Sequence, residues 1–501
     1  MIKLIALGLG LVTAGMAALL SPGPGEAALC EADLVPRLQA RLAQPPLDRA
    51  DLGMVLQTLA GPGQPQRTLY SHQGDRRFTP ASSLKLLTTA AALDRLGPDY
   101  RIRTSVYGRL GPGGVTELRL VGRGDPTLGQ SQIDQLAAQL VAAGVTRVSR
   151  WILDDSYFPG PALNPTWEWE DLQYAYAAPV NGLMFNRNAL SLVLIPGLIG
   201  QPLRLEWPGP GLPPGWPLVN QTTTVAAGVE TQPLILTRQL GSPDLYLQGS
   251  LPIEAGPRRL ELAVLDPGQG FQRALALALG ASGLQVEAPI IRPGADPGTA
   301  ADVELASLLS PPLRDWLGAA NRDSHNLSAE VLLKTLGVTQ GPPESTDASQ
   351  GGTQVVKTTL ATLGVDTSPL YLVDGSGLSR HNLVTPRALV ETLQAMAQHP
   401  QARVFQDSLA IAGVSGTLRQ RFQPGPLAGR LQGKSGALTG NVALAGYLQP
   451  PHAPPLVFSV LINHAQEPAG ELRRHLDDIL ELVAQLSQGC YGRKRKSMVR
   501  V

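Results

Sequence analysis

Two residues of this sequence have types and a spacing that could do chemistry, Ser82 and Lys85 in the run Ser-Ser-Leu-Lys. Pro80 and small residues open this stretch, and apolar residues then recur at helical spacing, which predicts a helix from Ser82. The two side chains then lie one turn apart on one face, where an amine can act as base for a nucleophilic hydroxyl. Ser83 lacks such a partner, because Leu86 lies one turn further on. The alternative is an ordinary helix with a capping serine and a surface lysine.

Two further motifs come later in the chain, Ser324-His-Asn326 and Lys434-Ser-Gly436. The first lies at or just before a predicted helix start, and the second ends a predicted strand. Each is common by itself, since Ser324 and Asn326 could cap a helix and Lys434 could be a surface lysine. All three motifs in this order, each on a suitable element, form a specific pattern.

The elements that must position these motifs alternate between helical and strand-rich parts of the chain. Short strands separated by Gly/Pro turns dominate between about residues 100 and 300. Helices are expected at residues 33–50 (broken by two prolines), 82–96, 132–143, 324–337, 353–364, 385–398 and 471–486. Strands are expected at residues 54–59, 67–70, 101–107, 115–121, 145–153, 191–195, 234–238, 245–249, 259–264, 430–435, 442–448 and 456–462, with a loop at 340–352.

This order predicts an α+β fold, in which an antiparallel sheet flanked by helices is split by a long, mostly-β insertion of one or two small domains. The 501 residues are enough for two or three domains. We expect the split domain at residues 29–98 and 303–490 and the inserted region at 99–302. A signal peptide is expected at 1–28 and a basic tail at 491–501.

The first residues are typical of an export signal, because Lys3 precedes an apolar run that ends at a breaker of Pro, Gly and Ala. An uncleaved anchor is the alternative. We therefore expect an exported protein of the periplasm or cell wall. The basic tail is expected to be a solvated chain end rather than a contact with a membrane surface or wall polymer. Cys30 and Cys490 form a disulfide or stay two free thiols.

The charge of the chain argues against one class of partner. The formal net charge is +1 and charged residues make up 16% of the sequence. Because no basic surplus is available to neutralise phosphates, the sequence argues against nucleic acid as a partner.

With all three motifs in place, the chain resembles the penicillin-recognising serine D,D-peptidases. The long separation between Ser82 and Ser324 is similar to that in the D-alanyl-D-alanine carboxypeptidase/endopeptidases, the class C low-molecular-mass penicillin-binding proteins, and implies their β-lactamase/transpeptidase-like domain. The third motif carries Ser435 where the family usually has Thr, which keeps the hydroxyl. Further stretches that carry the resemblance are residues 120–128, 167–172, 177–179, 374–382 and 413–418.

The resemblance implies a role for each motif residue. Ser82 attacks the carbonyl between two D-alanines, and Lys85, held neutral by burial and neighbouring cations, takes its proton. Ser324 passes the proton to the leaving amine, and Asn326 binds the substrate amide. Lys434 lowers the pKa of Lys85 and attracts the terminal carboxylate of the substrate.

The third motif also contributes to substrate binding in this interpretation. Ser435 offers the substrate carboxylate a hydrogen bond, and Gly436 belongs to the same strand. The backbone N–H groups of Ser82 and Ala437 are expected to form the oxyanion hole.

Substrate choice is expected to depend on the inserted region. In related proteins an acidic residue, an aromatic residue and an arginine line a pocket for the free end of a diamino acid, and Asp171, Tyr176 and Arg380 match these positions. The free end of meso-diaminopimelate carries an ammonium group and a carboxylate. The Asp171 carboxylate complements the ammonium group, and Arg380 complements the carboxylate. The alternative is that Asp171 is a surface acid and Tyr176 a packing residue. Trp167 and Trp169 are expected in the core.

The prediction is therefore an exported serine D,D-peptidase that acts on peptidoglycan stem peptides, needs no cofactor and no metal, and is inhibited by β-lactams. The balance between carboxypeptidase and D-Ala-meso-diaminopimelate endopeptidase stays open. A β-lactamase is the alternative enzyme, against which the long insertion speaks. The alternative from another class is a penicillin-binding wall sensor that is acylated without turnover.

Overall fold

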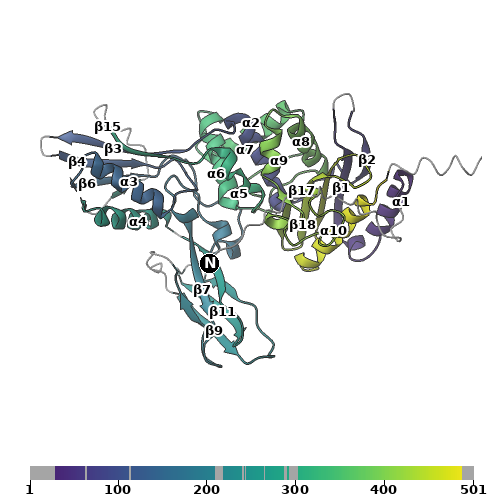
Figure 1. Ribbon diagram of the computed structural model, residues 1–501, viewed down its shortest axis with the longest axis horizontal. Helices are drawn as coiled ribbons and strands as arrows, with labels where there is room; N and C mark the ends of the chain where they lie inside the picture. The colour runs from purple at the N-terminus through teal and green to yellow at the C-terminus, as the bar shows by residue number, and fades with distance from the viewer. Residues whose placement is uncertain are drawn as a thin grey trace, which may run out of the picture.

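The computed structural model describes residues 29–61, 65–111, 114–208, 218–239, 242, 244–264, 266–286, 290–292 and 303–487. The expected signal peptide, the basic tail and Cys490 lie outside the described residues. The expected choice between a Cys30–Cys490 disulfide and two free thiols therefore also lies outside them. Within these ranges no helix is long and apolar enough to cross a bilayer. Figure 1 shows an elongated molecule with a helix-and-sheet body at one end and two strand-rich parts that project from it.

A six-stranded antiparallel sheet organises the body. Its strands run in the order β16 (Ala410–Ile411), β17 (Leu431–Leu438), β18 (Asn441–Leu448), β19 (Leu456–Asn463), β1 (Asp51–Thr58) and β2 (Thr68–His72). Every residue of β18 and β19 is buried. Alternate side chains point to opposite faces, so Val442 and Leu444 enter one core and Ala443 and Ala445 the other.

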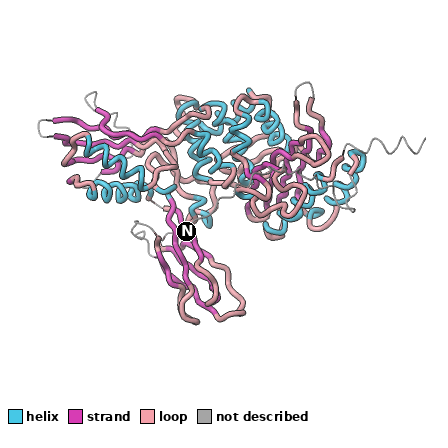
Figure 2. The backbone as a smooth tube through the Cα atoms, in the orientation of Figure 1, coloured by secondary structure: helices cyan, strands magenta, loops and turns pink. Residues whose placement is uncertain are grey.

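Helices cover both faces of this sheet. One core joins the sheet to the N-terminal and C-terminal helices, α1 (Glu31–Leu42) and α10 (Ala469–Ala484). The other core joins it to a group of helices in the middle of the molecule, which Figure 2 shows in cyan beside the sheet. That group comprises α2 (Lys85–Leu96), α5 (Leu313–Asn321), α6 (Asn326–Gln340), α7 (Ala348–Thr362), α8 (Pro386–Gln398) and α9 (Ala402–Asp407). The predicted antiparallel sheet flanked by helices is confirmed.

The inserted region contains two strand-rich parts. In one, a five-stranded sheet orders β14 (Ile290–Arg292), β6 (Arg150–Asp154), β4 (Gly114–Val121), β3 (Arg103–Gly111) and β15 (Val303–Leu309), and α3 (Gln130–Ala142) and α4 (Pro267–Ala281) pack with it in one core. Beside it the short β5 (Arg147–Val148) and β13 (Gln285–Val286) form a pair. In the other, two three-stranded sheets share a core: β10 (Ile235–Arg238), β11 (Leu245–Pro252) and β9 (Leu218–Val225), and β12 (Arg258–Ala263), β7 (Ala189–Ile195) and β8 (Arg204–Glu206).

Three local expectations differ from the structure. The helix expected from Ser82 starts as a 3₁₀ turn at Ala81–Leu84, and only then becomes α2. The expected loop at 340–352 is shorter, because Asp347 accepts hydrogen bonds from Ser349 N and Gln350 N and so caps α7. Helix α4 was not expected: its N-cap Asp266 accepts from Gln269 N at 3.1 Å.

The limits of the split domain remain a proposal. Strand β15 pairs with β3 from Val303 to Leu309, so we propose that the inserted region ends after Leu309 rather than at residue 302. At the other end of the chain, Leu29 N donates to Gln485 O and Ser487 N donates to Leu29 O, so the two described ends lie side by side.

Candidate active site

Ser82 and Lys85 are in direct contact at the start of α2. The distance between Lys85 Nζ and Ser82 Oγ is 2.8 Å. Ser82 is half-buried, whereas Lys85 has no exposed surface. Ala81 has a φ of 47°, and this left-handed residue begins the 3₁₀ turn that places Ser82 above Lys85. The predicted pair is therefore brought together, by a tighter turn than an α-helix.

Two more oxygen atoms hold the Lys85 amine. Its Nζ donates to Asn326 Oδ1 at 2.7 Å and to the Ser376 carbonyl oxygen at 2.6 Å. Burial lowers the pKa of Lys85 to about 7, although the carboxylates of Asp374 and Glu330 oppose this shift. The expectation was that burial and neighbouring cations together lower the pKa of Lys85. In the structure burial is the cause of the lowered pKa. Near neutral pH a large share of Lys85 is an unprotonated amine.

The second motif is held at the start of α6. Ser324 has a φ of 61°, and His325 is the N-cap that accepts from Ser328 N. The amide of Asn326 is fixed at both ends: its Oδ1 accepts from Lys85, and its Nδ2 donates to the Tyr176 carbonyl oxygen at 2.7 Å. Asn326 therefore ties Lys85, and through it Ser82, to the inserted region.

The third motif reaches the second from strand β17. Lys434 is fully buried, and its Nζ donates to Ser324 Oγ at 2.8 Å and to the Ser435 carbonyl oxygen at 2.6 Å. Burial, and then the charge of Lys85, lower the pKa of Lys434 well below its usual value. Ser435 Oγ donates to Thr417 Oγ1 at 2.7 Å, so two hydroxyl groups lie together at the exposed edge of the site. Thr417 had no separate role in the sequence-based prediction.

Gly436 lets strand β17 approach Ser82. A side chain here would place its Cβ atom 2.9 Å from both the Pro80 carbonyl oxygen and Ser82 N. Only glycine allows this approach without movement of the backbone. The Ser82 N–H therefore lies beside the segment that leads to Ala437, in keeping with the expected oxyanion pair.

A buried carboxylate that the sequence analysis missed supports the Lys85 site. Glu330 lies one turn after Asn326 on α6, and its Oε1 accepts from Gly375 N at 2.9 Å and Ser376 N at 2.8 Å. These bonds fix the Ser376 carbonyl that holds Lys85. Burial raises the pKa of Glu330. The available signal was a glutamate inside a helix whose neighbours are all suited to a core.

Asp374 fixes the rest of that segment. Its carboxylate accepts from Gly377 N, Ser379 N and Asn382 Nδ2 at 2.7–2.8 Å. It also accepts from Trp167 Nε1 at 3.0 Å, which ties the segment to the inserted region. Trp167 is buried as expected.

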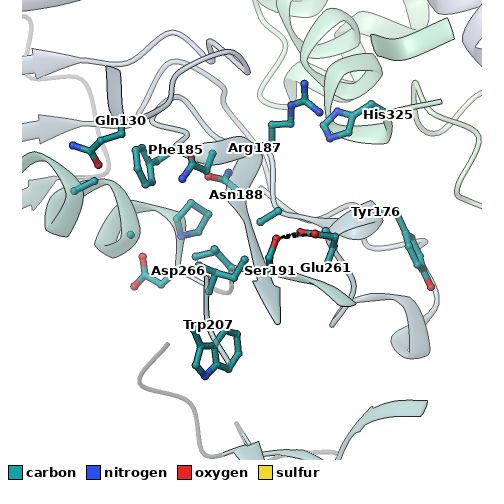
Figure 3. A pocket seen from close by; sticks show the side chains of 18 of the residues that line it. Gln130, Tyr176, Phe185, Arg187, Asn188, Ser191, Trp207, Glu261, Asp266 and His325 are labelled. Carbon is teal, nitrogen blue, oxygen red and sulfur yellow. Dashed lines mark hydrogen bonds between the residues drawn. The ribbon is translucent and has the colours of Figure 1, made fainter. Parts of the chain in front are cut away.

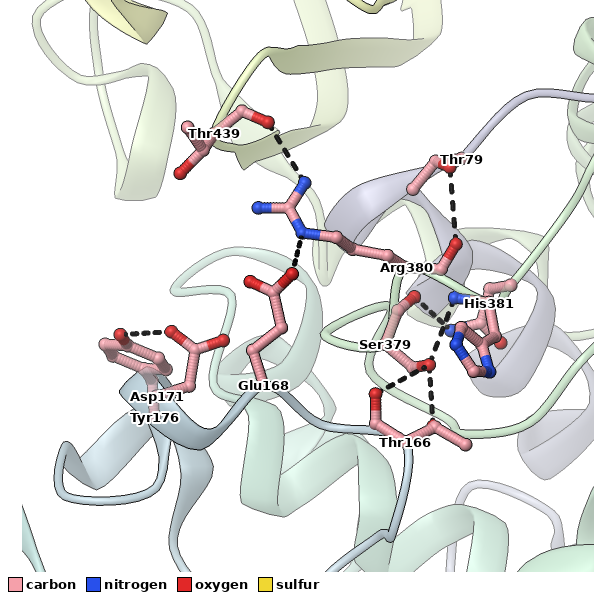
Figure 4. Close-up of polar contacts among 10 residues, drawn as sticks. Thr79, Thr166, Glu168, Asp171, Tyr176, Ser379, Arg380, His381 and Thr439 are labelled. Carbon is pink, nitrogen blue, oxygen red and sulfur yellow. Dashed lines mark hydrogen bonds and ion pairs between the residues drawn. The ribbon is translucent and has the colours of Figure 1, made fainter. Parts of the chain in front are cut away.

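The three residues expected to choose the substrate fall into two neighbouring groups (Figure 4). Tyr176 Oη donates to Asp171 Oδ1 at 2.7 Å. Arg380 instead pairs with Glu168 Oε1 through its Nε at 2.6 Å and donates to the Thr439 carbonyl oxygen at 3.0 Å. Glu168 was considered only as part of a longer segment, so its role as partner of Arg380 was missed.

The surroundings of this group are partly open. Tyr176 is 45% exposed, which fits a binding surface better than a packing residue. Burial raises the pKa of Asp171, while its hydrogen bond from Tyr176 lowers it. Trp169, expected in the core, is 38% exposed, because it lies on the short turn at Trp169–Asp171 rather than under it. Across the described residues, no three His, Cys, Asp or Glu side chains are grouped as a metal site.

Comparisons with known proteins agree with this geometry. The model of the D-Ala-D-Ala carboxypeptidase 3 (S13) family matches residues 34–483. A D-alanyl-D-alanine carboxypeptidase of Actinomadura sp. (strain R39) is 34% identical over 450 residues, which cover 86% of this chain and 81% of that protein.

Solved structures show the same fold. Penicillin binding protein 4 (dacB) of Haemophilus influenzae superposes with a TM-score of 0.76 at 23% identity, covering 90% of this chain and 98% of that one. A structure of the same protein complexed with a β-lactam gives a TM-score of 0.69 at 22% identity, with the same coverage of both chains.

The resemblance carried by the three motifs is thus confirmed over nearly the whole described length. A family model that spans both halves of the split domain and the insertion between them leaves one assignment: the chain belongs to the D-Ala-D-Ala carboxypeptidase 3 (S13) family of serine peptidases.

Proposed function

We propose that this protein is an exported D,D-peptidase that cleaves D-alanyl bonds of peptidoglycan stem peptides through an acyl-enzyme on Ser82. The observation that carries the proposal is the set of three contacts of Lys85 Nζ, to Ser82 Oγ, Asn326 Oδ1 and the Ser376 carbonyl oxygen. A neutral amine has two hydrogens and one lone pair. The two acceptors take the hydrogens, and the lone pair is left for the hydroxyl proton of Ser82.

The positions of these groups support the following acylation step. Lys85 takes the proton of Ser82 as Oγ attacks the carbonyl carbon of the penultimate D-alanine, and the backbone N–H groups of Ser82 and Ala437 stabilise the oxyanion. Ser324, bonded to Lys434, relays to the leaving nitrogen the proton that Lys85 took from Ser82, so that the C–N bond breaks and Lys85 is neutral again. A water molecule later attacks the ester with Lys85 as base. A β-lactam would acylate the same serine.

The terminal carboxylate of the substrate fits beside Ser435 and Thr417. Their hydroxyl groups already lie 2.7 Å apart, and both can turn toward an anion. Burial and the charge of Lys85 lower the pKa of Lys434. A bound carboxylate would favour the protonated form of Lys434 and so strengthen the attraction.

Asp171, Tyr176 and Arg380 are proposed to hold the free end of a diamino acid side chain. Asp171 offers a carboxylate to an ammonium group. Arg380 is engaged by Glu168 in the structure, so a substrate carboxylate would have to share or replace that ion pair. Glu168 therefore joins the proposed pocket as the residue that orients Arg380.

The decisive experiment separates this function from its two alternatives. Purified protein is incubated with a D-Ala-D-Ala pentapeptide and, separately, with penicillin, and released D-alanine and hydrolysed penicillin are measured. The proposal expects D-alanine release that stoichiometric penicillin blocks. Rapid penicillin turnover would identify a β-lactamase, and stable acylation without any peptide hydrolysis would identify a sensor.

A further inference from the structure

The cavity shown in Figure 3 has a volume of about 970 Å³ and lies beside the second motif, so it belongs to the site already described. Ser324, His325 and Asn326 form one end of it. A separate groove of about 780 Å³ lies on helix α7, and no residue of the three motifs is among its described lining residues. This α7 groove has no role in the mechanism above.

The α7 groove has three walls. One is a face of α7, and the others are the segment 161–166 of the inserted region and the segment 367–373 of the body. Asn164 Nδ2 donates to the Val373 carbonyl oxygen at 2.7 Å, which joins the second wall to the third. Asn164 Oδ1 accepts from Thr166 N at 3.0 Å and from Thr166 Oγ1 at 2.7 Å. Because these bonds hold the walls in place, the groove is formed before any ligand binds.

Tyr371 places an aromatic side chain in the groove. This residue lines the groove and is 55% exposed. Its backbone is fixed, because Tyr371 N donates to the Leu383 carbonyl oxygen at 3.0 Å and Leu383 N donates to the Tyr371 carbonyl oxygen at 2.8 Å. A tyrosine held in this way offers a ligand an apolar ring and a hydroxyl group on a fixed backbone.

Helix α7 supplies polar groups that are open to a ligand. Gln350, Gln354 and Lys357 are four and three residues apart, so they lie on one face of α7, and all three line the groove. Among the described residues, no hydrogen bond or ion pair engages the two side-chain amides or the Lys357 ammonium. The one acid in the described lining, Asp347, caps α7 by accepting from Ser349 N and Gln350 N. This wall therefore presents uncharged amides and one ammonium.

An aromatic ring opposite amides and an ammonium suits a sugar. A sugar ring presents C–H groups on its face, which pack on an aromatic ring, and oxygen atoms around its edge, which bond amides and an ammonium. An N-acetyl group adds an amide that a glutamine side chain can both donate to and accept from. A peptide that binds as an added strand needs free backbone groups, but Leu383 already engages those of Tyr371. A nucleic acid would meet a single cation among the described lining residues.

The groove lies close to the proposed diamino acid pocket. Thr166 lines the groove, and Glu168, which pairs with Arg380, follows two residues later. Two residues of extended chain span about 7 Å at most. Thr166 Oγ1 also lies 2.7 Å from Ser379 Oγ, and Ser379 precedes Arg380 in the chain (Figure 4). In peptidoglycan a short peptide joins the diamino acid to a sugar, so one substrate can reach both places.

We propose that the α7 groove binds the glycan of peptidoglycan, with the Tyr371 ring against the face of an N-acetylated sugar and the polar groups of α7 bonded to its edge. The inference rests on the proposed function and names its substrate class. Stem peptides that are still attached to glycan are bound at two places, and free peptides at one. The protein therefore cleaves glycan-linked stem peptides more efficiently than free ones.

Substitution of Tyr371 tests the groove. Tyr371→Ala removes the ring, and Tyr371→Phe keeps the ring without the hydroxyl group. Tyr246→Ala on β11, at a tyrosine that does not line the groove, is the matched control. For each variant kcat/KM is measured with a disaccharide-linked D-Ala-D-Ala pentapeptide and with the same pentapeptide without sugar, and penicillin acylation verifies folding. Co-sedimentation with glycan strands stripped of their peptides measures binding without catalysis.

The proposal predicts that the wild type has the higher kcat/KM on the sugar-linked peptide, and that Tyr371→Ala lowers the ratio of the two values about fivefold, as for the loss of one aromatic contact. Tyr371→Phe should keep most of the ratio, and Tyr246→Ala should leave it unchanged. An unchanged ratio in Tyr371→Ala, or an equal loss on both substrates, overturns the glycan site. If the wild type cleaves neither peptide, the proposed function fails, and the glycan site then stands or falls with the loss of glycan binding in Tyr371→Ala.

Discussion

At the scale of single residues, the proposed mechanism depends on a lysine whose pKa is lowered by burial. Lys85 has no exposed surface, and its pKa is lowered to about 7. In the proposed mechanism its neutral form donates to Asn326 Oδ1 and the Ser376 carbonyl oxygen and keeps its lone pair for the Ser82 hydroxyl. The same burial would be destabilising without those contacts, since a buried polar group needs partners.

The first prediction concerns pH. Below about pH 7 Lys85 binds a proton and loses the lone pair that serves as base, so acylation should fall about tenfold for each pH unit. The second-order rate of penicillin acylation, measured between about pH 5 and pH 9, should therefore rise to a plateau with its midpoint near the pKa of Lys85. A rate independent of pH below this midpoint would exclude Lys85 as the base.

A second prediction concerns Asp171. Asp171→Asn keeps the size of the side chain and an acceptor for Tyr176 Oη but removes the charge that is proposed to meet an ammonium. We expect a loss of about tenfold in kcat/KM for peptides with a free amino group on the diamino acid, as for one charged hydrogen bond. Peptides in which that amino group is acetylated serve as the control and should show little change. Equal losses on both peptides would argue for a structural role.

At the scale of elements, three pieces of chain converge on Ser82: the turn before α2, the start of α6 and strand β17. The close packing of β17 on the turn makes Gly436 a sensitive position. Gly436→Ala would place a methyl group 2.9 Å from Ser82 N, so the turn or the strand must shift. We expect penicillin acylation to slow by about tenfold or more with an intact fold, since small displacements at a reacting centre are costly.

The matched control for this change is Gly470→Ala on α10. A Cβ atom there meets no heavy atom within 4 Å, and alanine favours a helix over glycine. Acylation should be unchanged in this variant, and thermal unfolding should occur at the same or a slightly higher temperature. If Gly436→Ala acylates as fast as Gly470→Ala, β17 does not set the position of Ser82.

A further prediction belongs to α6 and the segment after α7. Glu330→Ala leaves Gly375 N and Ser376 N without their acceptor inside the protein, at about 1–3 kcal/mol for each unsatisfied group. Glu330→Gln keeps an oxygen acceptor and should cost less. In urea unfolding, the free energy of unfolding should be highest for the wild type, lower for Glu330→Gln and lowest for Glu330→Ala. Equal losses in the two variants would show that the charge, rather than the acceptor, is needed.

At the scale of the whole molecule, much of the architecture could be predicted from the sequence. Short motifs with fixed spacing predicted the family, and strand and helix patterns predicted a sheet flanked by helices, both of which are confirmed. Apolar periodicity is a direct consequence of burial on one face, so strands such as β18 and helices such as α8 were expected close to their observed bounds.

Contacts between distant segments were not present in the sequence. The sequence did not reveal the hydrogen bonds of Glu330, because its partners at residues 375 and 376 meet it only in the fold. Arg380 was matched to a pocket with Asp171, yet the carboxylate that pairs with it is that of Glu168. Helix α4 was missed, since its Gly/Pro-rich start resembled the turns around it, and capping by Asp266 decides the outcome.

The central claim is that Ser82 is the nucleophile of a D,D-peptidase, and it can be tested directly. Wild-type protein, Ser82→Ala and Ser83→Ala are incubated with labelled penicillin, and the modified peptide is located by mass spectrometry. The account predicts one label per molecule on Ser82 in the wild type and in Ser83→Ala, and no label in Ser82→Ala. A label on another residue, or labelling of Ser82→Ala at the wild-type rate, would contradict it.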